Sequence, residues 1–229
     1  MSVLPDEMTA PIHDLSQLIM LIYGVPKIGK STFCSHADDA LFLATEPGLK
    51  SLSVFAIEVE KWKDILDAGA ELGKSERFKT IVVDTIDIAY QHCLDHVCLA
   101  HSIKHPQDLE YGKGWALVNK EFSRVIIKLA TLGRGLIFVS HSQDITLKTR
   151  TAELTKSVPT LGGKSRDFIL GISDIVLYAE MTETKEGQQR ILHAAPSESW
   201  EAGDRTGCLP ETMPLDWTAV AENLKGGSE

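Results

Sequence analysis

The sequence lacks any apolar run of the roughly 18 to 20 residues that are needed to cross a bilayer. Residues 1–17 also lack the basic start and apolar stretch of a secretory signal. We therefore expect a cytoplasmic protein that does not insert into a membrane. Basic residues are also in short supply, because 23 Lys and Arg stand against 32 Asp and Glu, a formal net charge of -9. This balance excludes a generally basic coat for nucleic acid, so any DNA contact must come from a local patch.

The four cysteines include no CxxC pair, which argues against a zinc ribbon or a redox motif and favours reduced thiols. A cluster of histidines and cysteines between residues 92 and 105 raises the question of zinc, because imidazole and thiolate are ligands that zinc prefers. Its spacing fits no standard finger. A helix that packs on a sheet with its histidines outward is the favoured interpretation. The cluster consists of His92, Cys93, His96, Cys98, His101 and His105.

Apolar runs alternate with amphipathic stretches along the first 140 residues, without internal repeats. This alternation predicts an α/β fold with a mainly parallel central sheet and helices on both faces. We expect strands at 18–23, 41–44, 53–57, 80–84 and 135–140, and helices at 30–40, 61–72, 86–100 and 114–132.

The last third of the chain has a different pattern. A polar, basic loop or hairpin is expected at 143–166, strands at 172–179 and 189–193, and a closing helix at 217–224. The sheet should therefore become partly antiparallel. Length and composition favour one domain over residues 1–229, with flexible ends at 1–16 and 226–229.

One segment matches the GxxxxGK[ST] phosphate loop at every fixed position, directly after an expected strand and before an expected helix. Its glycines allow the backbone to curl so that successive amides point at phosphate oxygens. Lys30 would place a cation between the β- and γ-phosphates, and the Ser31 hydroxyl could bind Mg²⁺. A chance match at a strand-turn-helix junction is the alternative. The predicted ATP-binding residues are Gly24, Val25, Pro26, Lys27, Ile28, Gly29, Lys30, Ser31 and Thr32.

Two carboxylates are candidates for the chemistry of ATP hydrolysis. Asp84 ends an apolar strand, the usual setting of the residue that holds Mg²⁺ beside a phosphate loop, although a strand-terminal Asp is often only a turn residue. Thr85 follows it, so the base that polarises water must come from elsewhere. Glu46, at the end of another expected strand, is the candidate, and a solvated turn carboxylate is the alternative.

The succession GVPKIGKST, LFLATEPG, TIVVDT and GLIFVSHS resembles the RecA-type recombinase core. More closely, it resembles the phage-encoded AAA_24 nucleotide-binding proteins, which include Sak-type single-strand annealing proteins and are reduced RecA-like P-loop ATPase cores. YGKGW at 111–115 and DRTGCLP at 204–210 are similar to later motifs of that family, and the resemblance covers about residues 18 to 215.

This resemblance implies roles for three further residues. Glu46 corresponds to the catalytic glutamate of the RecA class. His141 stands where recombinases have a glutamine that senses the γ-phosphate, with a buried structural histidine as the alternative. Arg205 resembles the arginine of a KNRFG-like motif that reaches a nucleotide across a subunit boundary. Gly203 replaces the lysine of that motif, and an exposed, solvated arginine is the alternative.

The loop after the sensor strand contacts single-stranded DNA in the RecA class. The matching segment here is locally basic and could follow a phosphate backbone, although it has no aromatic residue for base stacking. A solvated loop is the alternative. The predicted DNA-binding residues are Lys148, Arg150, Lys156, Lys164 and Arg166.

The sequence thus predicts a RecA-like ATPase that binds ATP and Mg²⁺ and acts in single-stranded DNA annealing or recombination. We expect a homo-oligomer, as a ring or filament, and a single-strand-binding protein as a further partner. A nucleotide-dependent regulatory or protein-interaction module without DNA contact is the main alternative. A small-molecule kinase is a third, although no arginine-rich lid is evident.

Overall fold

The computed structural model describes residue 4 and residues 6–148, 153–184 and 187–226. The α-helices are α1 (Lys30–Cys34), α2 (Trp62–Leu72), α3 (Ile86–Ala100), α4 (Lys113–Ala130), α5 (Gly163–Ile172) and α6 (Trp217–Gly226). The strands are β1 (Ile19–Gly24), β2 (Ala40–Ala44), β3 (Phe55–Glu58), β4 (Thr80–Asp84), β5 (Gly135–Lys148), β6 (Glu153–Pro159), β7 (Ile175–Thr184), β8 (Gly187–His193), β9 (Gly203–Asp204) and β10 (Thr212–Pro214). Short 3-10 helices are η1 (Leu15–Gln17), η2 (Pro106–Asp108) and η3 (Glu110–Gly112).

The strands form a mixed sheet with the order β10-β8-β7-β1-β5-β4-β2-β3. Every pairing from β7 to β3 is parallel, whereas β8 and β10 add in the antiparallel sense. β5 lies between β1 and β4, and its register places Gly24 opposite His141. This is a RecA-like P-loop fold, and the predicted mainly parallel sheet with a partly antiparallel C-terminal part is confirmed.

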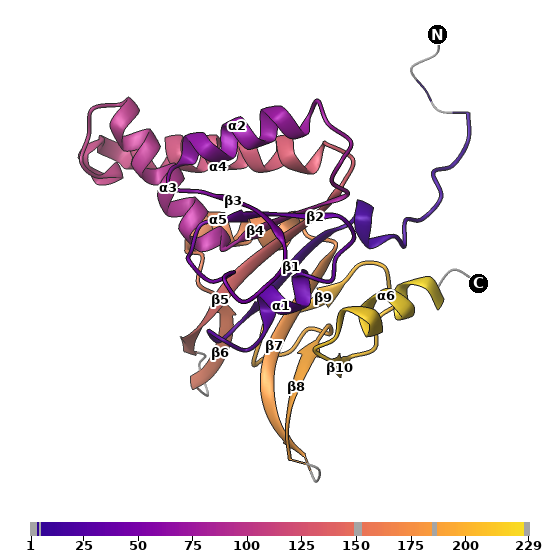
Figure 1. Ribbon diagram of the computed structural model, residues 1–229. Coiled ribbons are helices and arrows are strands. Elements are labelled where there is room, and N and C mark those ends of the chain that lie inside the picture. The colour runs from indigo at the N-terminus through magenta and orange to yellow at the C-terminus, as the bar shows by residue number, and fades with distance from the viewer. Residues whose placement is uncertain (1–3, 5, 149–152, 185–186, 227–229) are drawn as a thin grey trace.

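Helices cover both faces of the sheet (Figure 1), which explains why β1 and β4 read as continuous apolar runs. One buried cluster joins the sheet to α2, α3, α4 and α5, and it includes Trp62, which stacks on Phe122 with ring centroids 6.0 Å apart. The other cluster joins the opposite face to α1 and α6, with Phe33 against Trp217. The sheet is therefore the shared middle layer of two apolar interfaces.

Two hairpins extend past the carboxyl ends of the parallel strands. β5 continues beyond its buried part and pairs with β6 from Ser142 to Lys148, and β7 continues into its pairing with β8 (Figure 1). Both hairpins flank the edge at which the phosphate loop follows β1. In α/β sheets, ligands bind at this edge.

The structure corrects the prediction at two of the helices. The helix predicted at 30–40 ends at Cys34, because residues 35–39 form turns, and the Ser35 hydroxyl donates to the Thr32 carbonyl oxygen at 2.7 Å. Residues 163–172 form α5, with Ile169 buried, where the sequence predicts the end of a loop and the start of a strand. The predicted flexible ends fall partly outside the described residues, at 1–3, 5 and 227–229.

Candidate nucleotide-binding site

The predicted phosphate loop joins β1 to α1, and its backbone requires glycine at two positions. A Cβ on Gly24 would lie 2.4 Å from the Ala179 carbonyl oxygen on β7, so no side chain fits there without displacing a neighbouring strand. Gly29 has φ of +112°, in the left-handed region that favours glycine. Lys27 also has positive φ, at 66°. The chain therefore curls tightly between the strand and the helix.

Lys30 is a buried cation inside this curl, with 5% of its surface exposed. Its Nζ donates to the carbonyl oxygens of Gly24, at 2.8 Å, and Val25, at 3.0 Å. Burial lowers the pKa of its ammonium group, while the carboxylate of Asp84 and other nearby acids oppose that effect. An ammonium has three donors, so one remains for an anion. The residues present thus fit a bound phosphate.

Ser31 and Asp84 meet beside Lys30. The Ser31 hydroxyl donates to Oδ2 of Asp84 at 2.6 Å. Asp84 ends β4 and is 8% exposed, and burial raises the pKa of its carboxyl, an effect that the hydrogen bond from Ser31 opposes. A hydroxyl and a carboxylate fit Mg²⁺, which keeps several waters and needs few protein ligands.

Glu46 reaches the same edge of the sheet just after β2. Its Oε1 accepts a hydrogen bond from the Thr85 hydroxyl at 2.7 Å and lies 3.3 Å from Nε2 of His141. The side chains of His141 and Glu46 are 31% and 37% exposed, so water reaches both. The backbone is fixed as well, because the Thr45 hydroxyl accepts from the Thr85 amide and donates to its carbonyl. The structure therefore brings these two predicted residues together next to Asp84.

Asp87 is a buried residue of this site that sequence reasoning missed. It lies in the first turn of α3, and its carboxylate accepts from the Ser140 hydroxyl at 2.7 Å and from the His141 amide at 2.9 Å. Burial raises the pKa of its carboxyl. It ties β5 to α3 at the point where β5 reaches Glu46. An acidic residue three positions after Asp84 was the available signal.

Arg205 lies at the amino ends of the parallel strands, whereas the phosphate loop lies at their carboxyl ends. Its guanidinium is 3.7 Å from Oδ1 of Asp174 and donates to the Gly171 carbonyl oxygen, and 58% of its side chain is exposed. Asp174 also accepts from the amide of Ile19, at the start of β1. Arg205 therefore does not reach the phosphate loop of its own chain, and its predicted role across a subunit boundary stays a prediction.

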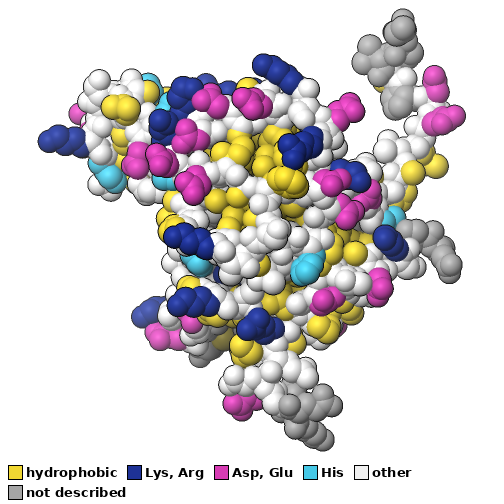
Figure 2. All heavy atoms as spheres, in the orientation of Figure 1, with side chains coloured by type: hydrophobic (Ala, Val, Ile, Leu, Met, Phe, Trp, Pro, Cys, Tyr) yellow, Lys and Arg dark blue, Asp and Glu magenta, His cyan; other side chains and the backbone are white. Residues whose placement is uncertain are grey.

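The predicted DNA-binding residues divide between two elements. Lys148 and Lys156 lie on the β5–β6 hairpin, where they pair with Glu153 at 3.0 Å and Glu201 at 2.9 Å. Lys164 and Arg166 lie in the first turn of α5. Figure 2 shows Lys and Arg side chains over the lower left of this face, near the β5–β6 hairpin, with acidic side chains among them. Arg150 lies outside the described residues.

The histidine and cysteine cluster is spread over α3 and the segment after it. Cys93 and Cys98 are buried, and the Cys93 thiol lies 3.8 Å from the Val118 carbonyl oxygen on α4. Over the part of the chain that the structure describes, no group of three or more His, Cys, Asp or Glu side chains could hold a metal ion. In the same residues, no helix combines the length and apolar character of a membrane span.

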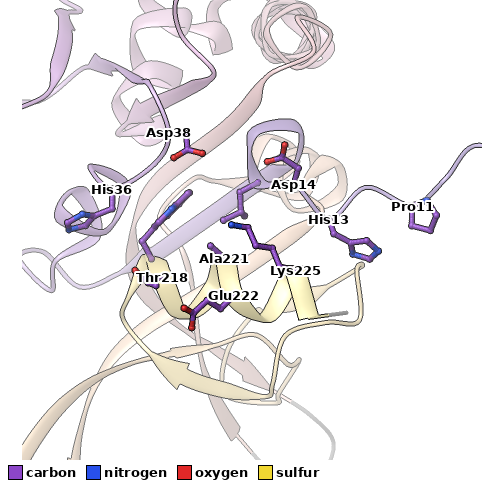
Figure 3. Close-up of a pocket in the computed structure, with 11 residues that line it drawn as sticks. Pro11, His13, Asp14, His36, Asp38, Thr218, Ala221, Glu222 and Lys225 are labelled. Carbon is purple, nitrogen blue, oxygen red and sulfur yellow. The ribbon is translucent and has the colours of Figure 1, made fainter. Parts of the chain in front are cut away.

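A hollow with a volume of about 1030 Å³ lies between the N-terminal segment, the turn after α1 and α6 (Figure 3). His13, His36, Asp38 and Lys225 are among the residues that line it. Within the described part of the chain, none of the predicted site residues lines this hollow. It lies at the far end of α1 from the phosphate loop.

The phosphate loop at the end of a central strand and the Ser31–Asp84 pair beside it define a P-loop nucleotide-binding domain. Residues 16–206 match the AAA_24 family, an AAA domain, and the chain belongs to this family. It is an AAA-type nucleotide-binding domain, and membership of this family implies that it binds ATP or ADP.

The known proteins that are similar to this chain include a prophage-derived protein and an archaeal flagellar accessory protein. The SPbeta prophage-derived uncharacterized protein YorG of Bacillus subtilis (strain 168) is 26% identical over 219 residues, which are 90% of this chain and 64% of YorG. The chain thus spans under two thirds of the length of that relative. The crystal structure of the flagellar accessory protein FlaH from Methanocaldococcus jannaschii aligns with a TM-score of 0.46 and 11% identity, over 86% of this chain and 84% of that one.

Proposed function

We propose that this chain is a Mg²⁺-dependent ATPase that acts on single-stranded DNA in annealing or recombination, as Sak-type annealing proteins do, in the cytoplasm of a bacterial host. The observation that supports it most is the convergence of Lys30, Ser31, Asp84, Glu46 and His141 at one edge of the sheet. This set supplies a phosphate-binding cation, a metal-binding pair and a carboxylate that water can reach. The same β5 strand that presents His141 continues into the β5–β6 hairpin, which carries Lys148 and Lys156.

In the proposed mechanism, Lys30 and the backbone amides of the loop bind the phosphates of ATP. Ser31 and Asp84 would hold Mg²⁺, which when bound offsets charge on the phosphates. Glu46 orients the attacking water and accepts its proton. His141 hydrogen-bonds the γ-phosphate through Nε2, the ring nitrogen that lies beside Glu46. Arg205 completes the site of a neighbouring subunit in a ring or filament.

Calorimetry with Mg²⁺ and ATP tests the nucleotide site. We expect Lys30→Ala to abolish measurable binding, because the loop would lose its buried cation. Glu46→Gln should keep ATP affinity and lose turnover by at least about a hundredfold, since a side-chain amide still accepts from Thr85 but is no base. Lys63→Ala removes an exposed lysine on α2 and serves as the control. Unchanged hydrolysis in Glu46→Gln would remove that residue from the mechanism.

A second candidate is a nucleotide-dependent interaction module without DNA contact. The pairing of Lys148 and Lys156 with carboxylates, together with the net charge of -9, favours it. ATPase rates measured with and without single-stranded DNA over a salt series discriminate the two. Stimulation by DNA that fades with salt supports the first function. No stimulation and no DNA binding at low salt would leave the interaction module.

A further inference from the structure

Arg190, on β8, lies beside the phosphate loop at a position that no sequence motif marks. In the β7–β8 pairing it stands opposite Met181, two residues beyond Ala179, and Ala179 is itself opposite Gly24 at the end of β1. This register places Arg190 level with the loop that follows β1. A Cβ built on Gly29 would lie 3.3 Å from Nη1 of Arg190, so the guanidinium reaches the loop itself.

Arg190 and the phosphate loop lie on the same face of the sheet. Leu192, two residues further along β8, is buried in the same cluster as Ile28 and Phe33. Because alternate residues of a strand share a face, Arg190 projects to the side of α1. Its backbone is held on both sides, by β7 and by the amide of Leu215, which donates to the Arg190 carbonyl at 3.0 Å. The guanidinium therefore extends from a fixed strand.

The charge of Arg190 has no counterpart in the described part of the chain, where its guanidinium makes no hydrogen bond or ion pair with another residue. It faces a loop that already contains the buried cation of Lys30. Arg190 is exposed, so its guanidinium is accessible to a ligand at the loop, and an anion bound there would interact with both cations. A guanidinium presents paired donors that match two phosphate oxygens.

We propose that Arg190 binds the phosphates of the nucleotide held by its own chain. The inference rests on the proposed function, and it deepens that function by giving the site a second cation that requires no neighbouring subunit. In this respect Arg190 differs from Arg205, which lies at the opposite edge of the sheet.

Calorimetric titration of the full chain with ATP and Mg²⁺, and separately with ADP and Mg²⁺, tests the proposal without relying on turnover. Arg190→Ala should weaken ATP binding on the order of tenfold to a hundredfold, the usual effect of losing a hydrogen bond to a charged group. Arg190→Lys should lie between Arg190→Ala and the wild type, because a lysine keeps the charge but not the paired donors. Arg77→Ala removes an exposed arginine that packs over Phe55 and Phe78, and it should bind ATP like the wild type.

Thermal melting without nucleotide controls for folding, and Arg190→Gln replaces Arg190→Ala if the alanine variant is not folded. Wild-type affinity in a folded Arg190→Ala or Arg190→Gln variant, with binding lost in Lys30→Ala, would overturn the role of Arg190 and leave the proposed function standing. Absence of ATP binding by the wild type would overturn both. Mixing Arg190→Ala with Lys30→Ala chains should not restore tight binding, and recovery on mixing would contradict action within one chain.

Discussion

At the scale of single residues, the position of the phosphate loop depends on Gly24, because only a residue without a side chain fits against β7 there. Gly24 and Ala179 belong to adjacent parallel strands, and the 2.4 Å approach of a Cβ to the Ala179 carbonyl leaves no room for alanine. The loop and β7 are therefore in direct backbone contact. Any added atom must separate β1 from β7 or move the loop away from Lys30.

We expect Gly24→Ala to destabilise the protein by about 1–3 kcal/mol, the usual cost of overpacking. Urea denaturation without nucleotide measures this change. Gly48→Ala is the matched control, because a Cβ at Gly48 meets nothing within 4 Å and its φ lies outside the left-handed region. Equal stability of the two variants would show that β1 and β7 can separate without cost.

Individual residues also show which parts of the site could be predicted from the sequence and which could not. Asp84 and the loop were found because their signals are local, a motif and an apolar strand that ends in a carboxylate. The approach of Arg190 to Gly29 depends on two registers, that of β8 against β7 and that of β7 against β1. The β7–β1 pairing joins residues more than 150 positions apart. Sequence pattern alone does not encode that register.

At the scale of elements, prediction succeeded where burial imposes one pattern. β4 and α3 have the predicted bounds, because one is an apolar run buried on both faces and the other a long amphipathic stretch. α5 was missed because its first turn is polar and basic, and only Ser165 and Ile169 are buried along its length. β5 extends eight residues past its predicted end, because residues 142–148, which are largely exposed, pair with β6 in the antiparallel sense.

The β5–β6 hairpin is the element whose charges test DNA binding. Replacing Lys148 and Lys156 together by alanine should weaken binding of single-stranded DNA and reduce its salt dependence. The slope of log K against log salt should fall by about 0.7 for each phosphate that the two lysines no longer neutralise. Fluorescence anisotropy of labelled oligonucleotides over a salt series measures both quantities. Lys63→Ala with Lys128→Ala, on α2 and α4, removes the same charge elsewhere, and equal weakening in both double variants would indicate a general effect of net charge.

At the scale of the whole molecule, the two edges of the sheet have different roles in the proposed assembly. The phosphate loop lies at one edge and Arg205 at the other. A neighbouring subunit must therefore bring its opposite edge to the nucleotide for Arg205 to act.

We expect Arg205→Ala to lower turnover at least about tenfold, because an arginine supplied in trans stabilises charge during phosphoryl transfer. Mixing Arg205→Ala chains with Lys30→Ala chains should partly restore the ATPase rate, since the second chain supplies the missing arginine. Mixing with the Lys30→Ala, Arg205→Ala double variant should restore nothing. Full ATPase activity of the Arg205→Ala variant alone would show that Arg205 is a solvated surface residue without a role in turnover.

β5 joins the two ends of the proposed function in one continuous piece of backbone. His141 stands at the point where it leaves the layered interior, and Lys148 is seven residues further out, about 23 Å away at the rise of an extended strand. The strand is continuous between these positions, so a change of its direction at His141 would displace its outer end. A tilt of about 5° at His141 would carry Lys148 sideways by about 2 Å over such a length.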